Sequence, residues 1–139
     1  AQRDAHEKGL WFPYRAPMGY DKTQVIVGSE RLLVAMAEEP DWPADMYMTA
    51  ADLIVGTAQM MIDGGFEFDG AFIYDDMGYR NGALFSPAMY REQCFPAHKK
   101  ICDLFHRYGL KVILHIAATS PSLSRSSLRP DSTACSRLR

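Results

Sequence analysis

The segment that decides the fold begins with GAFIYDD at residues 70–76 and ends with LKVILHI at residues 110–116. Residues 71–74 form a continuous apolar run between a glycine and two acids, which is typical of a strand buried on both faces. The apolar run that ends the segment predicts a second strand. A helix is predicted between them, because Ser86 and Pro87 are typical of an N-cap and a first helical turn. This order predicts one βαβ unit whose two strands are parallel.

The carboxyl ends of the two predicted strands carry polar side chains. Asp75 and Asp76 follow the first strand, and His115 ends the second. Parallel α/β folds bind their ligands beyond the carboxyl ends of the strands. We therefore expect these three side chains to lie on one rim of the sheet, close in space although distant in the sequence.

Local signals predict the elements before this segment. Residues 1–23 are polar and contain prolines, which predicts a loop, and the β-branched run at 23–28 predicts a short strand. Ser29 is typical of an N-cap and predicts a helix that stops before Pro40. Asp41 begins a longer helix that ends at a glycine pair. The positions of this longer helix expected to face the core are Met46, Ala50, Leu53, Thr57, Met60 and Met61.

The helix after Ser86 is expected to have one buried face and one solvated face. Pro96 is expected to bend it, because proline lacks a backbone N–H. The consecutive polar residues His98, Lys99 and Lys100 predict a solvated face. His6 has no partner that the sequence identifies. The expected core face of the helix consists of Tyr90, Cys94, Ala97, Ile101, Leu104, Phe105 and Tyr108.

The composition excludes several classes of protein. A formal net charge of −2 argues against a nucleic-acid-binding domain, which usually has a strong basic excess. Three cysteines without a CxxC pair cannot form a disulfide framework, and this usage is typical of a reducing compartment. Asp52 and Asp63 interrupt the longest apolar run, which argues against a membrane span. We expect a soluble, cytoplasmic chain that interacts with neither nucleic acid nor membrane.

Three longer motifs occur in a fixed order. They are EEPDWPADM at 38–46, IDGGFEFDGAFIYDDMG at 62–78 and LFSPAMYREQCFPAHKKICDLFHRYGLKVILHI at 84–116. Together they resemble the uroporphyrinogen decarboxylase (URO-D) superfamily over roughly residues 28–116. The resemblance implies a (β/α)8 TIM-type barrel, a fold that usually needs about 250 residues. We therefore expect residues 1–116 to be a partial α/β barrel domain, the middle portion of the whole barrel.

The superfamily implies two different activities. Its decarboxylases act on porphyrinogens in porphyrin biosynthesis without metal or organic cofactor, and use an Asp that accepts hydrogen bonds from pyrrole N–H groups. At the strand end, however, they tend to show Phe-x-Ser where this chain has Tyr74-Asp75-Asp76. The cobamide-dependent methyltransferases instead hold zinc on a His-x-Cys pair and a later Cys, and transfer a methyl group from a methylated corrinoid to a thiol. His115 matches the His of that pair, but residue 117 is alanine.

The resemblance assigns roles to the polar residues at the strand ends. Asp75 and Asp76 are the candidate catalytic residues, and we favour Asp75 for contact with the substrate over the alternative of loop capping. His115 is a metal ligand only in an intact methyltransferase relative, because zinc needs at least three protein ligands. The candidate substrate-binding residues are Tyr74, Tyr79 and Arg80. A homodimer of the intact protein and a non-catalytic fragment both stay open as interpretations.

The last 23 residues, 117–139, differ in composition from the rest of the chain. They are rich in Ser, Arg, Pro, Thr and Ala and contain few large apolar side chains, so we expect disorder there. Where relatives have Cys-Gly-Asp, this chain has alanines, and codons for Ala117 and Ala118 shifted by one base can encode Cys-Gly. We therefore interpret residues 117–139 as a frameshifted, non-family tail, with a genuine exposed tail as the alternative.

Overall fold

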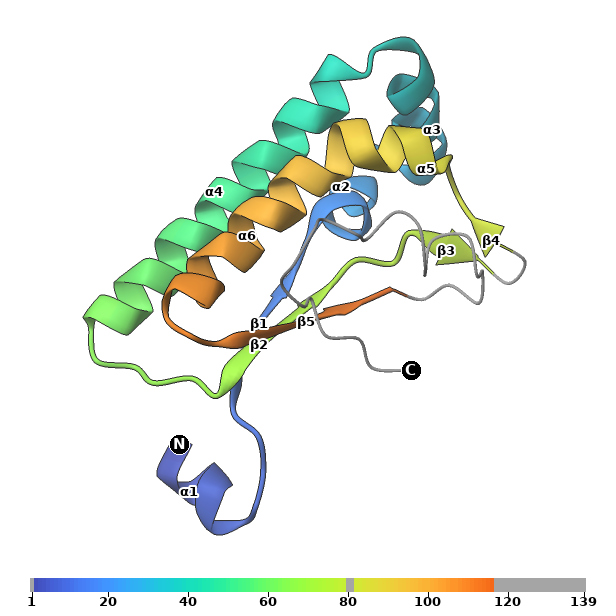
Figure 1. Ribbon diagram of the computed structural model, residues 1–139. Coiled ribbons are helices and arrows are strands. Elements are labelled where there is room, and N and C mark those ends of the chain that lie inside the picture. The colour runs from blue at the N-terminus through green and yellow to red at the C-terminus, as the bar shows by residue number, and fades with distance from the viewer. Residues whose placement is uncertain (1, 80–81, 117–139) are drawn as a thin grey trace.

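The computed structural model describes residues 2–79 and 82–116. A three-stranded parallel sheet is covered on one face by α2 to α6, while α1 lies beyond its amino-terminal end (Figure 1). The helices are α1 (Gln2–Glu7), α2 (Gly19–Val27), α3 (Ser29–Glu38), α4 (Asp41–Asp63), α5 (Pro87–Met89), the π-helix η1 (Tyr90–Cys94) and α6 (Phe95–Arg107). The strands are β1 (Pro13–Pro17), β2 (Gly70–Tyr74), β3 (Gly78–Tyr79), β4 (Gly82–Ala83) and β5 (Lys111–His115).

The sheet has the order β1-β2-β5, and all of its strands are parallel. The predicted βαβ unit is therefore confirmed, with Tyr74 paired with His115 at the carboxyl end. The expectation that residues 1–23 form a loop is wrong, because β1 lies within them and pairs with β2 from Pro13 onward. Among the described residues this sheet does not close into a barrel.

Residues 23–27 belong to α2 and Gly28 follows it, so the strand expected over residues 23–28 does not form. β-Branched residues favour strands only weakly, and tertiary contacts often override that preference. Here α2 begins at Gly19, and the backbone N–H of Asp21 in its first turn donates to the carboxylate of Asp75, 2.8 Å away. This contact with a residue that follows β2 satisfies a donor that a helix cannot satisfy by itself.

The predicted helices α3 and α4 are confirmed, but α4 buries a different face from the one expected. Leu53 and Met60 are 72% and 76% exposed. The helix is apolar around most of its circumference, so periodicity alone does not select a face. Small side chains at Ala51 and Ala58 face the core and allow close packing against α6. The buried residues of α4 are Pro43, Tyr47, Ala51, Ile54 and Ala58.

The helical region after Ser86 agrees with most of the expected pattern. The Ser86 hydroxyl accepts a hydrogen bond from the Met89 N–H at 3.2 Å, as an N-cap does. The π-helix η1 ends two residues before Pro96, the residue at which a bend was expected because proline lacks a backbone donor. Tyr108 is 44% exposed, so it does not belong to the core as expected. The predicted core residues that are buried are Tyr90, Cys94, Ala97, Ile101, Leu104 and Phe105.

The start of the chain is attached to the sheet through Asp69, which precedes β2. Its carboxylate accepts a hydrogen bond from the Phe12 N–H at 2.7 Å and contacts His6 Nε2 at 2.8 Å, so His6 has a partner that the sequence did not identify. The Phe12 N–H and then the His6 side chain lower the pKa of Asp69.

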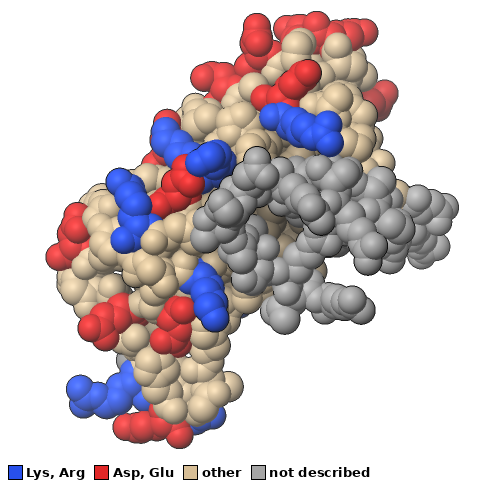
Figure 2. Space-filling view, viewed as in Figure 1, with Lys and Arg blue, Asp and Glu red and all other residues tan. Residues whose placement is uncertain are grey.

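The surface seen in Figure 2 has interspersed charges over α4 and α6. Lys100 pairs with Asp52, and Lys99 pairs with Asp103. No continuous basic surface therefore forms on this face among the residues that the structure describes. In that same part of the chain, no helix combines the length and apolar character that a membrane crossing requires. The predicted tail, 117–139, lies outside the described residues.

Candidate functional site

One group of side chains lies on the sheet face away from α2 to α6, near the carboxyl ends of the strands. Successive side chains of a strand point to opposite faces, and the buried Ala71 and Ile73 point toward the helices. The residues between and after them, Phe72, Tyr74 and Asp76, therefore point the other way. Arg15 on β1 and His115 on β5 lie on the same face. We call Arg15, Phe72, Tyr74, Asp76 and His115 the open-face cluster.

Ring contacts connect the members of the open-face cluster. The Arg15 guanidinium lies over the Phe72 ring, 5.5 Å from its centroid. The His115 ring stacks on Phe72 with centroids 6.0 Å apart, and Phe72 also contacts Tyr74 at 6.4 Å. His115 Nε2 lies 3.9 Å from Asp76 Oδ1. A cation, an acid, an imidazole and two aromatic rings are therefore presented together on one face.

Asp75 and Asp76 lie on opposite sides of the sheet. Asp76 is partly exposed on the open face, whereas Asp75 is fully buried beneath the helices. The expected proximity of these acids to His115 is confirmed, since the Asp75 N–H donates to the His115 carbonyl at 3.0 Å. The Asp75 carboxylate, however, points into the core, so of the two acids Asp76 is the one that a ligand on the open face can contact.

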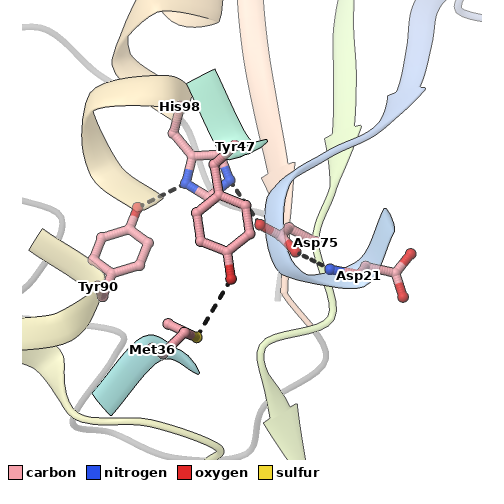
Figure 3. A network of polar contacts seen from close by, with 6 residues as sticks. All are labelled: Asp21, Met36, Tyr47, Asp75, Tyr90 and His98. Atoms are coloured by element: carbon pink, nitrogen blue, oxygen red, sulfur yellow. Dashed lines mark hydrogen bonds and ion pairs between the residues drawn. The ribbon is translucent and has the colours of Figure 1, made fainter. Parts of the chain in front are cut away.

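The buried Asp75 carboxylate belongs to a polar network that the sequence did not predict (Figure 3). Asp75 Oδ2 lies 2.9 Å from His98 Nε2, and the Tyr90 hydroxyl lies 3.2 Å from His98 Nδ1. His98 is only 4% exposed, so its expected place on a solvated face is wrong. The helical spacing could have indicated this burial. Position 98 lies four residues after Cys94 and three before Ile101, so it shares their buried helical face.

Burial controls the ionisation of the groups around this network. It raises the pKa of Asp75, while the hydrogen bonds from His98 and from the backbone N–H of Asp21 oppose that rise. Burial also raises the pKa of the Cys94 thiol well above its ordinary value, and the negative charge of Asp75 adds to this effect. Because the thiolate is the reactive form, Cys94 has the properties of a structural cysteine, not those of a nucleophile.

Of the other predicted site residues, Tyr79 is not a member of the open-face cluster. Tyr79 lies on β3 and is 69% exposed. Arg80 lies outside the described residues, so its predicted role stays a prediction. Phe72 and Arg15 are the members that the sequence did not identify as site residues: Phe72 was interpreted only as part of a buried strand, and the segment of Arg15 was interpreted as a loop. The position of Arg15 opposite Phe72 in the β1–β2 register places it on this face.

The residues described do not fit a zinc site. His115 has Asp76 as a carboxylate neighbour, but zinc in proteins takes at least three protein ligands. No group of three or more His, Cys, Asp or Glu residues that could hold a metal occurs within residues 2–79 and 82–116. We therefore derive no chemical step through zinc for this part of the chain.

Comparison with known proteins gives one match. The family model described as uroporphyrinogen decarboxylase (URO-D) matches residues 23–131. The comparisons with curated proteins and with solved structures gave no match. The matched range extends past residue 116, where we place the end of the family-like part, and the frameshift hypothesis stays a prediction. The match covers most of the chain and includes β2, α6 and β5, which agrees with the partial α/β architecture; the chain belongs to the uroporphyrinogen decarboxylase (URO-D) family.

Proposed function

We propose that this chain binds a tetrapyrrole on the open face of its sheet and contributes to the decarboxylation of that tetrapyrrole. The observation that carries the proposal is the open-face cluster, in which Asp76, His115 and Arg15 share one face with two aromatic rings. A porphyrinogen is a large ring system with pyrrole N–H donors inside and carboxylates at its edge. The cluster offers a group for each of these features.

Each charged member of the cluster has a defined role in the proposal. The Asp76 carboxylate accepts hydrogen bonds from pyrrole N–H groups, and Arg15 pairs with a substrate carboxylate. Phe72 contacts both the Arg15 guanidinium and the His115 imidazole, so its ring supports both of these groups. Tyr74 adds apolar surface next to Phe72.

The proposed reaction removes a side-chain carboxylate from the tetrapyrrole. Protonation of the pyrrole gives a cation that can accept the electron pair of the breaking C–C bond. CO2 then leaves, the methylene carbon takes up a proton to become a methyl group, and the ring releases the proton that it first gained, which restores the pyrrole. Asp76 stabilises the cationic ring electrostatically, and His115, next to Asp76, is a group able to move a proton.

The proposal is tested by binding before it is tested by turnover. We expect uroporphyrin I to bind the chain with a change in its fluorescence, and we expect Asp76→Asn and Arg15→Gln each to weaken binding about tenfold, the range for one charge-assisted hydrogen bond. Asp103→Asn is the matched control, because Asp103 is similarly exposed but lies on α6. Equal affinity of Asp76→Asn and Asp103→Asn for uroporphyrin would overturn the proposed site. Conversion of uroporphyrinogen to coproporphyrinogen is the turnover assay.

A second candidate, zinc- and cobamide-dependent methyl transfer, rests on His115 alone, which lies on the open face at a strand end where that branch of the family is expected to hold zinc. The described residues do not supply the further ligands that zinc needs, so the first candidate has the stronger support. The two candidates differ in an observable way: binding of zinc that His115→Ala abolishes, together with methyl transfer to a thiol, supports the second. Loss of CO2 from uroporphyrinogen without added zinc supports the first.

A further inference from the structure

Three elements meet at a buried polar junction on the helix side of the sheet. The carboxylate of Asp75, just after β2, contacts the first turn of α2 and His98 on α6. Figure 3 shows His98 lying between Asp75 and Tyr90, with Asp21 on the other side of the carboxylate. We call Asp75, His98, Tyr90 and the Asp21 N–H the buried junction.

Every member of the buried junction has a defined partner. His98 Nε2 lies 2.9 Å from Asp75 Oδ2 and His98 Nδ1 lies 3.2 Å from the Tyr90 hydroxyl; in the tautomer with its proton on Nε2, the imidazole donates to Asp75 and accepts from Tyr90. Asp75 Oδ1 accepts from Asp21 N–H. Exposure of the Asp75, Tyr90 and His98 side chains is 0%, 1% and 4%, so a ligand on the opposite face cannot touch them.

Close approach of α2 to the carboxylate requires a special residue. Gly19 begins α2 with φ +58°, a conformation that favours glycine, and a Cβ added there would collide with Asp75 Oδ2. Two backbone hydrogen bonds also fix the chain on both sides of Asp75 in the sequence. Met18 N–H donates to the Tyr74 carbonyl at 3.0 Å, and Met77 N–H donates to the Asp75 carbonyl at 2.9 Å.

The junction is connected to the open-face cluster through the backbone. Asp75 N–H donates to the His115 carbonyl at 3.0 Å. The next residue, Asp76, points to the opposite face and faces His115 at 3.9 Å. The Asp75 carboxylate, on the helix side of the sheet, therefore fixes the peptide between Asp75 and Asp76. The position of that peptide sets the separation of Asp76 and His115.

We propose that His98 is a positioning residue for the open-face cluster. By holding the Asp75 carboxylate against α2, it keeps the end of β2 paired with β5 and keeps Asp76 beside His115. A buried polar contact is seldom more stabilising than apolar packing of the same volume, so geometric control is a better account of this contact than stability alone. The inference rests on the proposed function only for what Asp76 and His115 do with a ligand. The positions of Asp76 and His115 that it explains do not depend on that function.

Two near-isosteric variants test the inference in the full chain. The amide of Gln reaches about as far as Nε2 of His98, so His98→Gln keeps a donor for Asp75. His98→Asn reaches only about as far as Nδ1 and loses it. Hydrogen exchange is measured at the Asp21 and Asp75 amides, with the Asp69 amide at the other end of β2 as the reference, because it donates to Phe12 O at 3.0 Å.

We expect His98→Asn to speed exchange at the Asp21 and Asp75 amides about tenfold or more relative to the Asp69 amide, because the region around the junction then opens as a local unit. We expect exchange in His98→Gln to stay close to that of the wild type. Leu104→Ala is the control, because Leu104 is a buried residue of the same helix outside the junction and its truncation lowers stability without a local effect. If His98→Asn does not fold, His98→Leu takes its place as the variant without a donor, because Leu keeps the apolar volume. It is then compared with His98→Gln in the same way.

A uniform change at all three amides in His98→Asn, like that of Leu104→Ala, would overturn the inference. So would full protection of Asp75 in either variant that lacks the donor. The measurement needs no ligand, so its failure is distinguishable from failure of the uroporphyrin-binding test. If both hold, His98→Asn is also expected to weaken uroporphyrin binding more than Leu104→Ala does.

Discussion

Breaking the buried contact between Asp75 and His98 from one side is expected to destabilise the fold strongly. His98→Ala removes the donor to Asp75 Oδ2 and leaves the fully buried carboxylate with fewer partners. Removing the hydrogen-bond donor of a buried carboxylate typically costs about 1.5–3 kcal/mol. With a urea m-value of about 2 kcal/mol/M, the unfolding midpoint should fall by about 0.8–1.5 M.

Asp75→Asn tests the same contact from the other side. Asn keeps a carbonyl oxygen for the Asp21 N–H but removes the negative charge. In the double variant, Asp75→Asn with His98→Ala, no unpaired carboxylate is left. We therefore expect the loss of stability to be smaller than the sum of the single losses, with a coupling energy of about 2 kcal/mol, within the range for contacting residues.

Urea unfolding of the four proteins, followed by circular dichroism, measures this coupling. The exposed pair Lys99–Asp103 lies on the same helix and supplies a matched cycle. Pairs of that kind contribute about 0.3–0.5 kcal/mol. A coupling between Asp75 and His98 no larger than that of the exposed pair would refute the view that the buried contact is what holds the junction together.

Three further perturbations have distinct expected outcomes. Gly19→Ala should lower the urea midpoint more than Gly28→Ala, because both glycines have positive φ but only a Cβ at Gly19 meets the buried carboxylate. Leu53→Ala should change the free energy of unfolding by no more than about 0.5 kcal/mol, whereas Ile54→Ala should cost about 2–4 kcal/mol, since the structure buries only the second; similar effects of both would contradict the helix face described. Folding lowers the pKa of Asp69, so its contribution to stability is present above the ordinary pKa and is lost as the pH falls through the folded-state pKa. The difference in free energy of unfolding between the wild type and Asp69→Asn should therefore be largest above about pH 4 and should shrink as the pH falls further; a difference that does not change with pH would contradict this linkage.

The sequence by itself determined the elements that depend on short-range signals. The apolar runs of β2 and β5, the Ser86 N-cap and the right-handed crossover sufficed for the parallel pair. The same signals sufficed for the approximate bounds of α3 and α4, since caps, glycines and prolines act within one helical turn. These signals also predicted that the strand-end acids lie near His115.

Only the tertiary structure decided which face each residue presents. β2 is apolar on both faces, so its alternation separates Asp75 from Asp76 without saying which of them lies under the helices. α4 is apolar around most of its circumference, and its face is selected by close packing against α6.

Long-range contacts decided the rest. Residues 23–27 carry strand-forming side chains, yet they belong to a helix whose first turn donates to a carboxylate 54 residues away. His98 lies in a run of polar residues, yet it is buried because that same carboxylate supplies its partner. A local pattern cannot contain such a partner, so the tertiary structure alone converts Asp75 from a candidate substrate contact into the centre of the buried junction.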